Sequence, residues 1–289
     1  MREFGHAETG RFVRAQPIGW DSKLANNDGF DRWVKRFHPT GQARVRLVCF
    51  PHAGGSASGY FRLSAAMRPS VEVWSVQYPG RQERRHEAAH PDICTLAGAL
   101  VDVLQEHAGD PYVFFGHSMG AAVAFEVALQ LERLGRAPTA LVASGRRAPG
   151  THRVEQVHLR DDAGVAEELR LLSGTDPVFL RDPELMTMVM PAIRADYRAV
   201  ETYRPRPDAV LGCPITALVG DNDPRTTLDE AAAWRCHTTG TFDMRVFPGG
   251  HFFLDACLPR VVNVLADVAA THSVEQDRPG LELGEQRAG

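Results

Sequence analysis

The stretch YVFFGHSMGAAVAFEVALQLERLG, residues Tyr112–Gly135, decides the fold. A short run of aromatic and branched residues ends at Gly116, a histidine and Ser118 follow, and a long apolar segment begins after Gly120. The first run has the composition of a buried strand, and the second has the length of a buried helix. Two glycines at this junction permit a sharp turn, because neither carries a Cβ atom. The pattern therefore predicts a strand, a tight turn and a helix, with the side chain of Ser118 exposed above the sheet.

Similar apolar runs recur on both sides of this stretch and alternate with segments of helical length. The strand candidates are Val45–Phe50, Val71–Val76, Tyr112–Phe115, Thr139–Ser144, Ile215–Val219 and Asp243–Phe247. The helix candidates are Ile93–His107, Met119–Leu134, Thr227–Cys236 and Leu258–Ala270. Most of the strands are apolar on both faces, as in a parallel sheet covered by helices on both sides. The sequence thus predicts an α/β fold with a mostly parallel, doubly wound sheet.

One interval breaks this alternation, because from Gly150 to Pro207 we find no convincing strand. Two helical stretches, Ala163–Leu172 and Pro183–Thr202, are separated there by residues that interrupt helices. The interrupting residues are Gly174, Pro177 and Pro183. We interpret residues 150–207 as a helical lid inserted into the domain, rather than as a second domain.

The two ends of the chain differ in character from the part between them. Residues 1–31 and 272–289 are polar, contain glycine and show no hydrophobic periodicity. Such segments bury too little apolar surface to offset the entropy lost on ordering. We therefore expect a poorly ordered leader over 1–31, one folded domain over 32–271 and a flexible tail over 272–289.

Composition excludes several function classes. The formal net charge of −4 gives no reason to expect a nucleic-acid or anionic-membrane partner. Five cysteines are spaced neither as a disulfide framework nor as a zinc site. The N-terminus lacks the apolar core of a secretory signal, and no apolar run approaches the length of a membrane span. We expect a cytoplasmic protein that uses no metal and no cofactor.

The sequence GHSMG at 116–120 matches the Gly-x-Ser-x-Gly nucleophile elbow of the α/β-hydrolase fold. In that elbow the serine sits in a strained conformation between a strand and a helix, so that its hydroxyl projects above the sheet. The flanking strand and helix are the context that this motif requires. A tight turn without chemistry is the alternative; the elbow makes the hydroxyl of Ser118 the expected nucleophile.

A serine nucleophile needs a base, and the base needs an orienting carboxylate. On this fold the partners follow in the order Ser, Asp or Glu, His, each on a loop after a strand. The loop after the fifth strand candidate offers Asp221 and Asp223, and the loop after the sixth offers His251. We choose Asp223 as the orienting acid, since Pro224 fixes a turn directly after it. Asp221 is then expected to form or cap the turn.

The attack on a carbonyl creates an oxyanion, which N–H donors must stabilise. One expected donor is the backbone N–H of Met119, directly after the nucleophile. The second should come from the loop PHAGGSASGY at 51–60, where two glycines allow a bend toward the serine. The Ala53 N–H is our first candidate and the Gly54 N–H our second. A glycine turn without a catalytic role is the alternative.

Two basic stretches also follow strand ends and therefore border the same edge of the sheet. They are YPGRQERR at 78–85 and SGRRAPG at 144–150. Their arginines are interpreted either as a solvated charged face or as anchors for a phosphate or an acidic partner surface. The side chains concerned are Arg81, Arg84, Arg85, Arg146 and Arg147.

From about Trp33 to Ala270 the chain resembles the type II thioesterases of polyketide and nonribosomal peptide assembly lines. The motifs that carry the resemblance are RVRLVCFPHAGGSASGYFRLS, VEVWSVQYPGRQERR, FFGHSMGAAVAFEVA, SGRRAP, DYRAVETYRP, GDNDP and FPGGHFFL. The combination of FPHAGG, YPGR and GHSMG is much more specific than any one hydrolase motif. The long leader before Trp33 departs from the family pattern.

The resemblance implies an α/β-hydrolase fold with a helical lid over an acyl chamber. It implies hydrolysis of acyl groups from the phosphopantetheine thiol of acyl or peptidyl carrier proteins, which removes aberrant or stalled chains. The implied triad is Ser118, Asp223 and His251, and the implied oxyanion donors are Met119 and Ala53.

Three other functions share parts of this pattern. A medium-chain fatty acyl thioesterase or a general esterase would use the same triad on another substrate. A non-catalytic module that binds carrier proteins would need no triad, and the complete set of Ser118, Asp223 and His251 speaks against it.

Overall fold

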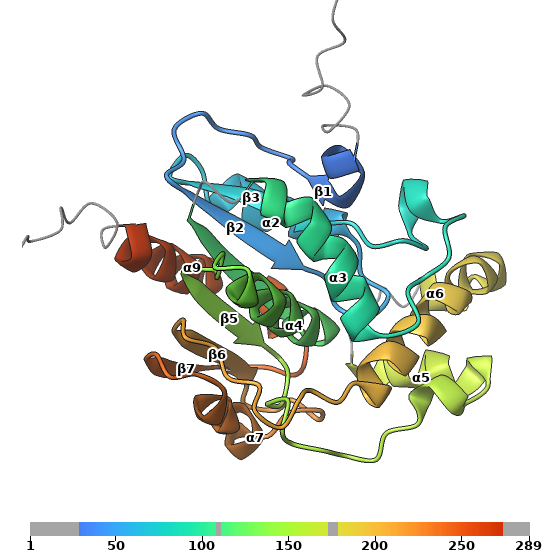
Figure 1. Cartoon of the computed structure of the whole chain (residues 1–289). Helices are drawn as coiled ribbons and strands as arrows, with labels where there is room; N and C mark the ends of the chain where they lie inside the picture. Colours follow the sequence, from blue (N-terminus) through green and yellow to red (C-terminus); the bar gives the residue numbers. More distant parts are fainter. Residues whose placement is uncertain (1–28, 108–110, 173–178, 274–289) are drawn as a thin grey trace, which may run out of the picture.

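The structure is a computed structural model, and it describes residues 29–107, 111–172 and 179–273 (Figure 1). Its described strands form one seven-stranded sheet in the order β1-β3-β2-β4-β5-β6-β7. β1 is antiparallel to β3, and the remaining pairs are parallel. The strands are β1 (Val34–Lys35), β2 (Val45–Phe50), β3 (Val71–Val76), β4 (Tyr112–His117), β5 (Ala140–Ser144), β6 (Ile215–Gly220) and β7 (Phe242–Phe247).

Helices cover both faces of the sheet, so the expected α/β fold is confirmed (Figure 1). α3 and α4 pack together on one face, and α2 and α9 pack on the other. The α-helices are α2 (Phe61–Ala66), α3 (Ile93–Leu104), α4 (Met119–Arg133), α5 (Asp162–Leu172), α6 (Pro183–Thr202), α7 (Leu228–Ala232), α8 (Phe253–Ala256) and α9 (Leu258–Ser273). Short 3₁₀ helices lie at Ala57–Tyr60, Gln82–Arg84, Gln105–His107, Val157–Leu159, Phe179–Arg181 and Ala233–His237. Within the described residues no helix is both long and apolar enough to cross a bilayer.

The central strands divide their side chains between two apolar cores. In β2, Val48 and Phe50 belong to the core under α3 and α4, whereas Leu47 and Cys49 belong to the core under α9. Successive strand residues point to opposite faces, which explains why these strands read as continuous apolar runs. Each fully buried side chain of this size contributes about 1.5–3 kcal/mol relative to its exposed state. The two cores hold the carboxyl ends of the strands rigidly, and the functional loops start there.

The segment between β5 and β6 contains α5 and α6, which lie beyond the carboxyl ends of the strands (Figure 1). It has a small apolar cluster of its own, which includes Val165, Leu169, Leu180 and Ile193. Most of the leader expected over 1–31 and of the tail expected over 272–289 lies outside the described residues. The predicted helix breakers Gly174 and Pro177 lie outside them too.

Candidate active site

Ser118 occupies the turn between β4 and α4, in a backbone conformation that is rare for a residue with a side chain. Its φ is 55° and its ψ is −117°. A Cβ atom on Gly116 would collide with the carbonyl of Gly120, and one on Gly120 would collide with the carbonyl of Phe50. The Ser118 N–H donates to the carbonyl oxygen of Ser144 at 2.8 Å, which ties the turn to β5. The two glycines and this bond hold the strained serine at the edge of the sheet.

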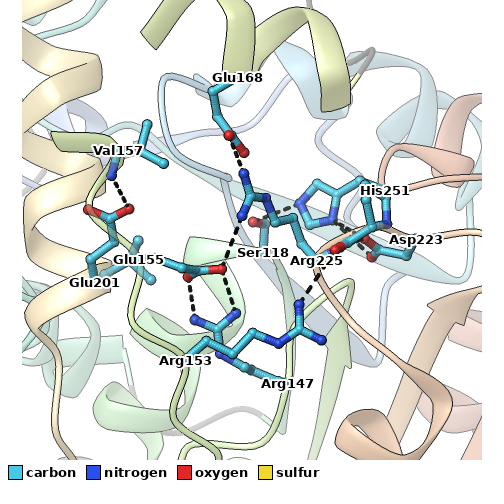
Figure 2. A network of polar contacts seen from close by, with 12 residues as sticks. Ser118, Arg147, Arg153, Glu155, Val157, Glu168, Glu201, Asp223, Arg225 and His251 are labelled. Atoms are coloured by element: carbon cyan, nitrogen blue, oxygen red, sulfur yellow. Dashed lines mark hydrogen bonds and ion pairs between the residues drawn. The ribbon is translucent and has the colours of Figure 1, made fainter. Parts of the chain in front are cut away.

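His251 and Asp223 meet Ser118 at this edge, although 133 residues separate Ser118 from His251 in the chain (Figure 2). The Nε2 atom of His251 lies 2.9 Å from the Ser118 Oγ atom. Its Nδ1 atom lies 2.9 Å and 3.0 Å from the two carboxylate oxygens of Asp223. Both side chains are buried, so the contacts are shielded from water. This arrangement can deprotonate the serine hydroxyl and stabilise the imidazolium that results.

The structure separates the two acids of the GDNDP loop. Asp223 contacts the histidine, whereas the carboxylate of Asp221 accepts hydrogen bonds from the Gly249 N–H at 2.9 Å and from the Asn222 amide at 2.7 Å. Asp221 thereby joins the loop after β6 to the loop after β7. It holds the turn, as the sequence predicted for this residue, and no hydrogen bond or ion pair joins it to His251.

The loop after β2 bends toward Ser118 and contains the two N–H groups predicted as candidates for the second oxyanion donor. The Gly54 N–H donates to the carboxylate of Asp196 at 2.7 Å, so it is already engaged. Among the described residues, neither the Ala53 N–H nor the Met119 N–H has an acceptor. Of the two candidates in this loop, Ala53 is therefore the one with a free donor.

Asp196 is a residue of this site that the sequence analysis missed. It comes from α6, is 5% exposed, and forms an ion pair with Arg81 besides its bond to Gly54. Arg81 in turn donates to the carbonyls of Gly55 at 3.0 Å and Pro79 at 2.6 Å. Burial lowers the pKa of Arg81 to about 10, which leaves it charged at neutral pH. A carboxylate among the apolar residues on the buried face of α6 was the signal available in the sequence.

The structure places the predicted arginines in different environments. Arg81 and Arg84 are buried, and Arg84 pairs with Glu87. Arg147 is also buried, and it pairs with Glu155. In the structure these three side chains form ion pairs that hold loops together. The other two remain accessible: Arg85 is exposed, and Arg146 is half-buried at the pocket beside Ser118.

Two further histidines, His52 and His117, lie next to the reactive one. Burial, followed by the proximity of His251, lowers the pKa of His52 to about 4. The same causes lower the pKa of His117 well below its ordinary value. The Nδ1 atom of His117 lies 3.0 Å from the Ser144 hydroxyl. Both rings therefore stay neutral at physiological pH and do not compete with His251 as a base.

A pocket opens beside Ser118, between the loops of the sheet and the helices α5 and α6. Its free volume is about 50 Å³, which is room for a few groups the size of a water molecule. Leucine and valine side chains form part of its wall, but charged side chains form another part: Arg146, Arg147, Glu155, Glu168, Glu201 and Arg225. In the described part of the chain, no cluster of His, Cys, Asp and Glu has the arrangement of a metal site.

Comparison with known proteins gives one consistent result. A family model for the thioesterase domain matches residues 45–270. The chain is 50% identical over 254 residues to thioesterase PikA5 of Streptomyces venezuelae, a match that covers 87% of this chain and 88% of that protein. It is 52% identical over 240 residues to a Streptomyces griseus protein named "Probable cadicidin biosynthesis thioesterase", over 83% of this chain and 66% of that protein. The solved structure of the type II thioesterase BorB from the borrelidin biosynthetic cluster has a TM-score of 0.78 and 45% identity, over 83% of this chain and 98% of that one.

Proposed function

Because the chain belongs to the thioesterase family, and within it to the type II thioesterases, we propose that it hydrolyses acyl groups from the phosphopantetheine thiol of carrier proteins. Its role is to remove aberrant or stalled chains from a polyketide or nonribosomal peptide assembly line. The observation that supports this most strongly is the 2.9 Å contact between His251 and Ser118, with the far side of the imidazole held by Asp223.

The proposed reaction begins when His251 takes the proton of the Ser118 hydroxyl and the serine oxygen attacks the thioester carbonyl. The N–H groups of Met119 and Ala53 stabilise the oxyanion that forms. The C–S bond then breaks, and the carrier leaves as a thiol once it has received the proton. In the second half-reaction His251 activates a water molecule, which attacks the acyl-serine and releases a free carboxylic acid. Asp223 fixes the tautomer of the imidazole and stabilises its charged form in both halves.

Carrier recognition is proposed to use Arg146, which lines the pocket, and the exposed Arg85. A guanidinium group suits the phosphate of phosphopantetheine or an acidic protein surface. The segment with α5 and α6 is proposed to act as a lid over the acyl group, since both helices face the pocket. We place the reaction in the cytoplasm, as the sequence predicted.

The test compares the same short acyl group on a carrier protein and on N-acetylcysteamine, at low and high salt. The proposal predicts a higher kcat/KM for the carrier-bound group, and a preference that shrinks as salt screens the charged contacts. Arg85→Ala should reduce the preference. Arg133→Ala is the matched control, since this exposed arginine lies at the far end of α4, about 20 Å from Ser118. Equal kcat/KM for both substrates at every salt concentration would replace carrier editing with a general acyl thioesterase or esterase.

A further inference from the structure

Glu168 is a buried carboxylate in the pocket wall whose two oxygen atoms are used very differently. It projects from α5 toward Arg225 (Figure 2), and its side chain is 1% exposed. Its Oε2 atom accepts from the guanidinium groups of Arg225 and Arg160, the latter at 3.3 Å. Its Oε1 atom is buried and has no hydrogen-bond partner among the described residues.

An acceptor of this kind is costly to leave unpaired. Nearly all buried polar atoms in folded proteins have a hydrogen-bond partner. The free-energy cost of leaving one unpaired is largest for an atom of a charged group. The neighbouring carboxylate of Glu155 shows the contrast. It pairs through Oε1 with Arg147 at 3.1 Å and with Arg225 at 3.4 Å, and through Oε2 with Arg147 again. Because no described residue donates to it, the Oε1 atom of Glu168 is available to accept a hydrogen bond from a bound molecule.

The position of Glu168 indicates where that donor would come from. Glu168 and Ser118 line the same small pocket, together with Leu169, Leu172 and Val200. An acyl group bound to the Ser118 oxygen would enter this space, because Ser118 forms part of its wall. Its alkyl part would contact the three apolar side chains, and a polar substituent could reach the carboxylate.

The charges around the pocket favour a neutral donor over a cation. Three guanidinium groups and three carboxylates line it, so the wall carries no formal excess of negative charge. The guanidinium groups of Arg225 and Arg160 both contact Glu168 directly. An ammonium group on the substrate would lie next to these two cations, whereas a hydroxyl group would not be repelled.

We propose that the acyl substrates of this enzyme carry a hydroxyl group, which donates a hydrogen bond to the free carboxylate oxygen of Glu168. The inference rests on the proposed function, because it assumes that the acyl group is bound at Ser118. It makes Glu168 a specificity-determining residue that distinguishes hydroxyacyl chains from plain alkyl chains of equal length.

The experiment measures kcat/KM for butyryl, 2-hydroxybutyryl, 3-hydroxybutyryl and 3-aminobutyryl groups on one carrier protein. A hydrogen bond to a charged acceptor should favour at least one hydroxyacyl group over butyryl about tenfold. In Glu168→Gln the amide oxygen has to take the place that faces Arg225 and Arg160, so an N–H donor replaces the free acceptor. We expect this variant to lose the preference for the hydroxyl group. Glu167→Gln is the matched control. The side chain of Glu167, next to Glu168 in the chain, is 74% exposed, so this change should leave the preference unchanged.

The outcomes separate this inference from the function on which it rests. Equal rates for butyryl and both hydroxybutyryl groups in the wild type overturn the inference while the thioesterase function stands, and this comparison needs no variant to fold. A hydroxyl preference that persists in a folded Glu168→Gln variant also overturns it. A preference for the aminoacyl group overturns the assignment of a neutral donor. No hydrolysis of any carrier-bound group would overturn the proposed function itself.

Discussion

Replacing Asp196 with asparagine should both destabilise the protein and slow catalysis. The Asp196→Asn variant keeps an oxygen that can accept from the Gly54 N–H, but it leaves the Arg81 guanidinium without a counter-charge. Both side chains of this ion pair are 7% exposed. Removing one partner of a buried ion pair lowers the free energy of unfolding by about 3–5 kcal/mol. Because the hydrogen bond to Gly54 is retained, we expect a loss of about 3 kcal/mol. Domains typically have about 5–15 kcal/mol of stability, so the variant should still fold.

The catalytic effect follows from the loop that this ion pair holds. Arg81 and Asp196 fix the backbone on both sides of Gly54, and the Ala53 N–H belongs to the same turn. Loss of one oxyanion donor costs about 10²–10³ in kcat. A displaced donor should cost less than a deleted one, so we expect a loss of roughly 10- to 100-fold in kcat.

Urea unfolding and the hydrolysis of a small thioester measure the two effects in the same samples. A double-mutant cycle with Arg81→Met gives the decisive test, because the double variant contains no unpaired buried charge. Its loss of stability should fall short of the sum of the single losses by about 1–3 kcal/mol. Asp208→Asn is the control, since it breaks a solvent-exposed ion pair with Arg206 and should leave stability nearly unchanged. Additive losses in the cycle, or single losses as small as the control, would refute the reasoning.

The remaining predictions concern the triad, pH and the lid. Asp223→Asn should lower kcat about 10³- to 10⁴-fold and Asp221→Asn less than tenfold, both folded by circular dichroism; the reverse ranking would reassign the acid. The folded chain keeps His117 neutral, whereas the unfolded chain protonates it, so the free energy of unfolding should fall as the pH drops below about 6.5. Urea titrations at several pH values should show a smaller fall for His117→Gln than for the wild type. The same dependence on pH in both proteins would contradict the burial argument. Hydrogen exchange should be faster in α5 and α6 than in β4 and α4; equal protection would indicate a rigid cap.

Much of the fold could be predicted because its signals are local. Val45–Phe50 and Val71–Val76 match β2 and β3 residue for residue, since each is a short, mostly apolar run that contains valines. The prediction was less accurate where pairing with a neighbouring strand determines where a strand begins or ends. The strand predicted to end at Phe115 continues to His117, because the pairing of Gly116 and His117 with β5 extends it through a glycine and a polar residue. β1 spans only two residues and is defined by its pairing with β3, so its sequence carries no signal.

The same distinction applies to the candidate site. The elbow motif and the order of the loops pointed to Ser118 and His251 from the sequence, and the structure brings their side chains into contact. Asp196 and Glu168 could not be found in this way. Both come from the segment between β5 and β6, and each pairs with an arginine far away in the chain: 115 residues separate Asp196 from Arg81, and 57 separate Glu168 from Arg225. Helical periodicity marks their positions as buried, but it does not say which arginine is nearby.

The most direct test of the central claim follows the acyl group itself through a single turnover. A carrier protein loaded with a short acyl group is mixed with excess enzyme, and intact-protein and peptide mass spectrometry record where the acyl mass lies over time. The account predicts that the mass leaves the carrier, appears transiently on the peptide that contains Ser118, and ends as free acid, while Ser118→Ala leaves the carrier acylated. Deacylation of the carrier by Ser118→Ala at the wild-type rate, or an acyl group on another residue, would contradict the account.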